Sequence, residues 1–333
     1  MSSLFTLSWR GLVSGSPLLG ADADANGNRD ASAGAVEAWT FCAILAVSFV
    51  AALYVLVPSR VRNLRHNDPA QILARFRATG ASSVASGALL WYWFGDRMAS
   101  SPLEILPWMG FRLGRIVTAS MRALLLAGFL FAGPLAVAAA EERARSSLTR
   151  RPFSFWALLP NARCFAGLEF WRNIWVAPFV EELVFRSCFA GPLVLARMSP
   201  WVICWASPLL FGFAHLHHAI GRMRSGTPPH MAMLAAVFQC AYTTLFGAFE
   251  MFVLLRTGHY VAIALVHSFC NSMGLPNLSF LTFDRHPLRE RRFVFAAIYL
   301  AGIAAFAAFL VPLTDPAYFE SVLWRHLSTP EII

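Results

Sequence analysis

Three charged residues, Glu181, Glu182 and Arg186, lie inside a long apolar stretch that extends from Phe165 to Leu195. A charge at the centre of a bilayer costs roughly 2.5–3.5 kcal/mol on insertion scales, so such residues usually pair or line a cavity. Glu182 and Arg186 are four residues apart, which places them on one helix face and predicts an ion pair. Glu181 is rotated by about 100° from that face. The spacing therefore assigns a structural role to Glu182 and chemistry to Glu181.

Two further polar clusters follow in later apolar segments. Phe211 and His215 are four residues apart and share a helix face, and imidazole is a frequent acid–base group. His215 could equally be an interfacial residue or an incidental metal binder. His267 and Asn271 are also four apart, and two neutral donors held side by side suit the stabilisation of an oxyanion. Hydrogen bonding between neighbouring helices explains this second pair just as well.

The three clusters together indicate more than any one of them. A carboxylate, a histidine and a histidine–asparagine pair on three spans could converge on one water molecule. They would supply a general base, a group that positions the water, and an oxyanion hole. This set is complete for peptide hydrolysis without a serine or cysteine nucleophile.

Other functions use the same residues differently. In a zinc metalloprotease, Glu181, His215 and His267 would be the ligands, although the sequence contains no HExxH helix. A cysteine protease would need Cys188 or Cys270, and neither has a base at a diagnostic spacing. A membrane transporter or scaffold also buries charged residues, but it predicts two related halves with broken segments, which the sequence lacks.

Composition predicts the elements that hold these clusters. Hydrophobic residues make up 57% of the 333 residues and charged residues only 14%. Several apolar runs approach the ~20 residues that span a bilayer, which predicts an all-α polytopic membrane protein, a bundle of about eight transmembrane helices with an intramembrane catalytic cavity. The expected apolar segments besides the glutamate helix are 36–57, 82–94, 116–140, 201–214, 231–255, 260–273 and 293–313, with a half-buried or re-entrant piece at 105–111.

The net charge of +9 comes from arginine alone, because the sequence contains no lysine. The arginines lie at segment ends, where they would face anionic headgroups, so we expect a lipid bilayer and no nucleic acid as partner. We expect a disordered N-terminal segment over residues 1–35, one transmembrane domain over 36–315 and a C-terminal tail over 316–333.

At its polar clusters the chain resembles the type II CAAX prenyl endopeptidases, the Ras-converting enzymes of the ABI/CPBP membrane proteases. The three motifs of this family are EExxxR, FxxxH and HxxxN. They match Glu181-Glu182-x-x-x-Arg186, Phe211-x-x-x-His215 and His267-x-x-x-Asn271, in that order. Flanking segments also fit, among them Phe238-Gln239 and Phe246-Gly247-Ala248, and the resemblance covers roughly residues 58–280.

The resemblance implies a multi-pass protease of the endoplasmic reticulum membrane, with eight transmembrane helices and no catalytic metal or other cofactor. Its substrates would be prenylated CAAX proteins, such as Ras- and Rho-like small GTPases, from which it removes the last three residues. By motif matching, Glu181 and His215 activate the water, and His267 and Asn271 form the oxyanion hole. Glu182 and Arg186 support the site.

Overall fold

A computed structural model describes residues 25–65, 67–99, 101–159, 167–283 and 286–329. Within these ranges all regular structure is helical, as the apolar runs predict. Three described helical segments are long and apolar enough to cross a membrane: Ser32–Val55, Pro229–Thr257 and Arg289–Leu313. The chain is therefore an all-α, multi-pass membrane protein, and the count of about eight spans stays a prediction. Several other described helices are shorter than the ~20 residues that a span needs.

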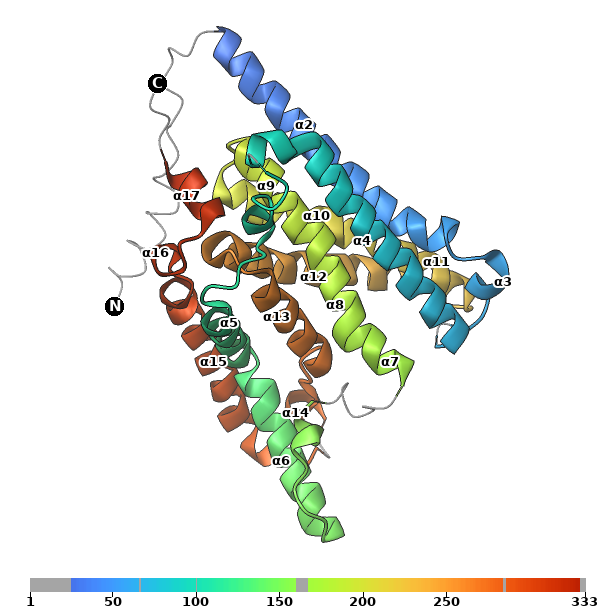
Figure 1. Ribbon diagram of the computed structural model, residues 1–333. Helices are drawn as coiled ribbons and strands as arrows, with labels where there is room; N and C mark the ends of the chain where they lie inside the picture. The colour runs from blue at the N-terminus through green and yellow to red at the C-terminus, as the bar shows by residue number, and fades with distance from the viewer. Residues whose placement is uncertain (1–24, 66, 100, 160–166, 284–285, 330–333) are drawn as a thin grey trace. The chain divides into compact units, whose positions relative to one another are not determined.

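The chain divides into two compact units. The first comprises Met1–Arg115, Val180–Val261 and Pro316–Ile333, and the second comprises Ile116–Phe179 and Ala262–Asp315. The main helices of the first unit are α2 (Ala25–Val55), α4 (Pro69–Met98), α9 (Cys188–Leu195), α10 (Pro200–Ala214), α11 (His217–Arg224) and α12 (Pro229–Thr257). Shorter pieces are α3 (Ser59–Arg62), η1 (Leu106–Met109), α16 (Pro316–Phe319) and α17 (Val322–Ser328). Figure 1 shows α2 and α4 side by side, and α10 packs along α12.

The predicted glutamate helix is confirmed as one helical run, but it is not a regular α-helix. It consists of α7 (Leu168–Phe170), the π-helix η4 (Trp171–Val176), α8 (Ala177–Glu182), the π-helix η5 (Leu183–Ser187) and α9. In the π turns an N–H bonds five residues back, as Ala177 does to the carbonyl of Arg172. Pro178 has no N–H to continue this pattern. Short π segments inside α-helices occur frequently at functional sites.

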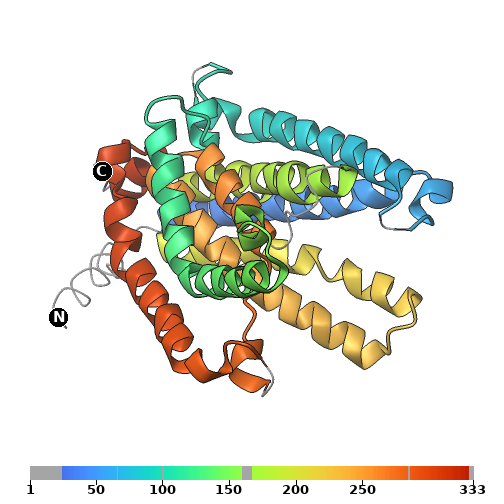
Figure 2. The ribbon, with the colours of Figure 1, turned by 90° about the horizontal axis from the view of Figure 1, so that it is seen from below.

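In the second unit, the expected span over 116–140 is broken. It forms α5 (Ile116–Leu130) and α6 (Ala132–Thr149), which are bent by 70° (Figure 2). Pro134 explains the break, because its ring would clash with the Leu130 carbonyl if the helix continued. Helix α15 (Arg292–Leu313) packs on both arms. The other elements are η2 (Phe155–Leu158), α13 (Tyr260–Met273), α14 (Ser279–Thr282) and η6 (Arg289–Arg291).

The two chain ends are more regular than predicted over their described parts. Helix α2 already begins at Ala25, inside the segment expected to be disordered, because an apolar helix propagates into flanking residues at little cost. The rest of that segment, 1–24, lies outside the described residues. The expected tail contains α16 and α17, and α17 packs on α9 and α12. The Oγ of Ser321 donates to the Leu255 carbonyl, which fixes the tail to the first unit.

Candidate active site

The ion pair predicted from the glutamate motif is present. Arg186 Nη1 lies 3.2 Å from Glu182 Oε1, and both side chains are fully buried. Glu182 ends α8 and Arg186 lies in η5, so the pair crosses the start of the second π segment. The prediction from i,i+4 spacing is confirmed here, even though the backbone departs from α-helical geometry.

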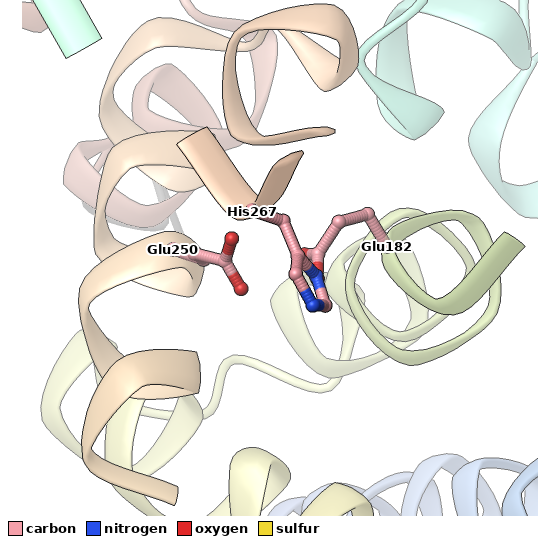
Figure 3. Close-up of side chains that lie close together, drawn as sticks. All are labelled: Glu182, Glu250 and His267. Atoms are coloured by element: carbon pink, nitrogen blue, oxygen red, sulfur yellow. The ribbon is translucent and has the colours of Figure 1, made fainter. Parts of the chain in front are cut away.

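A second carboxylate completes this group and comes from another helix. Arg186 Nη2 lies 3.2 Å from Glu250 Oε2 of α12, which is also fully buried. Figure 3 shows the side chains of Glu182 and Glu250, together with His267 of α13, which belongs to the second unit. Sequence reasoning left Glu250 out of the site, although a carboxylate inside an apolar helix is a signal for a buried cationic partner.

Gly247 makes room for this contact. A Cβ placed on Gly247 would lie 2.5 Å from Arg186 Nη2 and 2.8 Å from the Cβ of Pro208. Any larger residue one turn before Glu250 would therefore displace the guanidinium. The group of Glu182, Arg186 and Glu250, called here the Arg186 network, depends on this glycine for its geometry.

The Phe211 ring connects the Arg186 network to His215. Arg186 Cζ lies 4.2 Å from the Phe211 ring centroid, a cation–π distance, and the rings of Phe211 and His215 meet edge to face at 4.6 Å. This confirms the shared helix face that the spacing predicted. A buried aromatic in this position fixes both neighbours without adding a charge or a proton donor to the site.

His215 has a defined proton arrangement. Its Nδ1 lies 2.8 Å from the Phe211 carbonyl oxygen, which can only accept a hydrogen bond. Nδ1 therefore carries a proton, and in the neutral ring Nε2 holds the lone pair. The side chain is half-buried at the end of α10. A histidine held in this tautomer can accept a proton at Nε2 or position a water molecule there.

A tight turn separates α10, which ends at Ala214, from α11, which begins at His217, and in this turn the N–H groups of His215 and Leu216 bond three residues back. Three residues further on, the ring of His218 lies 5.7 Å from that of His215. His217 instead contacts the Tyr54 ring of α2 at 6.0 Å. Of the three histidines, His218 is thus the one that extends the face of His215 into α11.

Glu181 differs from its neighbour in burial. It is half-buried, whereas Glu182 is fully buried. This agrees with the rotation about the helix axis that separates the two residues, because Glu182 is directed to Arg186. The structure therefore distinguishes the two adjacent carboxylates as the sequence predicted, although the catalytic role of Glu181 itself stays a prediction.

His267 and Asn271 lie on α13 in the second unit. His267 is buried, and Asn271 Nδ2 donates to the Asn173 carbonyl oxygen at 2.9 Å. The N–H five residues after Asn173 would be that of Pro178, which does not exist. Asn271 thus donates to a carbonyl oxygen that has no backbone donor because of Pro178. Side chains of neighbouring helices bond such carbonyls in many membrane proteins. Sequence reasoning identified Asn271 but not this bond.

The structure thus brings Glu182, Arg186, Phe211 and His215 together in one unit and adds Glu250. The predicted convergence of Glu181 and His215 with His267 and Asn271 on one water molecule stays a prediction, as does the zinc alternative. Within the first unit, the carboxyl groups of Glu182 and Glu250 share one guanidinium.

Comparisons with known proteins agree with the motifs. A sequence model of the family described as "Type II CAAX prenyl endopeptidase Rce1-like" matches residues 163–273. CAAX prenyl protease 2 of Homo sapiens is 34% identical over 288 residues, covering 84% of this chain and 82% of that protein. The protein of that name from Rattus norvegicus is 31% identical over 84% of this chain and 81% of its own length. No solved structure matches. The chain belongs to the type II CAAX prenyl endopeptidase family.

Proposed function

We propose that this protein is a membrane endopeptidase that cleaves prenylated CAAX proteins after the prenylated cysteine and releases the last three residues. The observation that carries this proposal is the similarity to the human CAAX prenyl protease 2 over most of both chains. The three motifs that could supply the chemistry are intact within the matched region.

In the proposed reaction, Glu181 takes a proton from a water molecule that His215 positions through Nε2. The water oxygen adds to the carbonyl carbon of the scissile bond, and the carbonyl oxygen becomes an oxyanion. When this intermediate collapses, the C–N bond breaks and the proton passes to the leaving nitrogen. The products are a prenylcysteine carboxylate and a free tripeptide. The tautomer set by the Phe211 carbonyl supports this role of His215.

His267 and Asn271 would donate hydrogen bonds to the oxyanion, which is usually a large contribution to acyl-transfer catalysis. The amide nitrogen of Asn271 carries two N–H groups, so its bond to Asn173 is compatible with a second, catalytic bond. Glu182 and Arg186 would act indirectly. Their buried ion pair fixes the helix on which Glu181 lies.

We place the protein in the endoplasmic reticulum membrane, with Ras- and Rho-like small GTPases among its substrates. Both assignments rest on the resemblance to the family. The apolar helices described above support a multi-pass membrane location.

Hydrolysis of a farnesylated CAAX peptide by the detergent-purified protein tests the proposal. We expect Glu181→Gln and His215→Ala to lose at least about 100-fold in kcat, the range for a general base, while remaining folded. A chelator should have no effect. Chelator-sensitive activity that zinc restores would favour a metalloprotease instead. A folded wild-type protein that is inert towards prenyl peptides of several lengths would contradict the proposal and favour a transporter or scaffold.

A further inference from the structure

Arg222 on α11 is half-buried and differs from the fully buried Arg186 in its partners. Its Nη2 donates to Gln239 Oε1 of α12 at 3.0 Å, and its Nη1 is buried with no hydrogen-bond partner among the described residues. None of the ion pairs between described residues involves Arg222. Arg186, by contrast, has two carboxylates. Arg222 is thus a cation held by a neutral side chain, with no carboxylate partner among the described residues.

The position of Arg222 relates it directly to the proposed catalytic histidine. His218 and Arg222 are four residues apart and share one face of α11. The His218 ring lies 5.7 Å from the His215 ring, and one further helical turn of about 5.4 Å leads to Arg222. Arg222 therefore lies on the short helix that begins two residues after His215, on the face that carries His218.

Electrostatics support this proximity. Burial lowers the pKa of His218 to about 3, and neighbouring groups add to the shift. Those groups are, in decreasing order, His217, His215, Arg222 and Arg75. This end of the first unit therefore concentrates positive charge beside neutral imidazoles, an environment that favours a bound anion.

The proposed substrate carries an anion close to its scissile bond. Three residues follow the scissile bond of a CAAX protein, and the last of them ends in a free carboxylate. An extended chain spans at most about 3.3–3.6 Å per residue, so this carboxylate lies within about 10 Å of the reacting carbonyl. A guanidinium is the side chain best suited to bind a carboxylate, because its planar donors match the two oxygens.

We propose that Arg222, held by Gln239, binds the terminal carboxylate of the substrate and thereby sets cleavage at three residues from the end. This inference rests on the proposed function. It makes Arg222 a specificity-determining residue for a free C-terminus. Gln239 is a positioning residue that orients the guanidinium through Nη2.

The test compares two farnesylated peptides that differ only at the C-terminus, one a free carboxylate and the other a carboxamide. For the wild type we expect kcat/KM to favour the carboxylate by roughly 10- to 100-fold, the range for a hydrogen bond to a charged group. In Arg222→Gln this ratio should fall towards one, through KM. Arg222→Lys should recover part of it. The matched control is Arg224→Gln, two residues along α11 and exposed, which should keep the wild-type ratio.

Each other outcome has a distinct meaning. A wild-type enzyme that cleaves both peptides equally would overturn the carboxylate site and leave the proposed function intact. An unchanged ratio in Arg222→Gln would overturn the assignment to Arg222, and a collapse of the ratio in Arg75→Gln alone would transfer it to Arg75. A wild-type protein inert towards both peptides would contradict the proposed function and this inference with it.

Discussion

Two arginines of the first unit that contact glutamates, one exposed and one buried, show how burial changes the effect of a charge. Arg97 of α4 lies 2.8 Å from Glu37 of α2, with 55% and 43% of the two side chains exposed. Arg186 lies at 3.2 Å from both Glu182 and Glu250, and all three are fully buried. By distance alone the exposed pair is the closer one. Losing a partner nevertheless costs more in the buried network, because a charge in the interior that loses its partner cannot be solvated by water.

The comparison indicates that the Arg186 network positions the helices that carry it and contributes little net stability to the fold. Burying an ion pair costs about as much as the attraction returns, so the intact network need not stabilise the fold. Breaking it is a different matter, since it leaves uncompensated charge beside the helix that carries Glu181. Five changes test this contrast, beginning with the largest expected effect.

Arg186→Ala should lower the free energy of unfolding by about 3–5 kcal/mol, because it leaves two carboxylates without their cation. Thermal unfolding in detergent measures this. The triple variant Arg186→Met/Glu182→Gln/Glu250→Gln, which removes all the charges, should be less destabilised than the single variant. A single variant within about 1 kcal/mol of the wild type would show that the network resembles a surface pair.

Gly247→Ala should cost about 1–3 kcal/mol, because the added methyl group overlaps Arg186 Nη2 and Pro208. The matched control is Gly87→Ala in α4, where an added Cβ meets nothing within 4 Å. That control should be neutral or slightly stabilising, since it reduces the freedom of the unfolded chain. Equal unfolding temperatures for the two variants would mean that Arg186 can move aside without loss.

Acidification should destabilise the first unit through His218, a half-buried base with no carboxylate partner among the described residues. Its pKa is lowered from 6.5 to about 3 by burial and nearby positive charge, so the folded ring stays neutral while the unfolded ring binds a proton. Stability is complete above pH 6.5 and falls as the pH decreases towards 3, by roughly 1–2 kcal/mol at pH 5. His218→Gln should flatten this dependence, and the exposed control His230→Gln should not.

Asn271→Ala in the second unit tests a neutral pairing against the charged network. Loss of the bond to Asn173 should cost about 1 kcal/mol, the scale of polar contacts between membrane helices. Pro178→Ala would supply an N–H to the same carbonyl, so the double variant should regain stability. We expect its activity to remain low, because the proposed oxyanion contact is still absent. Recovery of full activity would make Asn271 a positioning residue only.

Arg97→Ala should have the smallest effect, between zero and about 1 kcal/mol, because both partners of this pair are solvated without each other. Its unfolding temperature, compared with that of Arg186→Ala, sets the scale for the whole contrast. If Arg97→Ala lowered the free energy of unfolding as much as Arg186→Ala does, burial would not explain the difference between the two contacts.

The long regular helices could be predicted closely from the sequence. The expected segment 260–273 is helix α13, and 201–214 and 231–255 fall within α10 and α12. Apolar runs bounded by Pro and Gly define such helices locally. The bend at Phe131 and the π segments around Pro178 were not predicted in this form. Hydropathy does not register the N–H that a proline lacks. The carbonyl left without a donor is bonded by side chains of other helices, which only the fold brings near.

Spacing by itself determined the pairs that lie on one helix: Glu182 with Arg186, and Phe211 with His215. Helical geometry decides these contacts whatever surrounds them. Only the tertiary structure decided that Glu250 shares Arg186, that Gly247 admits the guanidinium, and that Gln239 holds Arg222. These partners are far apart in the sequence and come from different helices, so no local period encodes their meeting. Packing of α12 against the glutamate helix and α11 creates it.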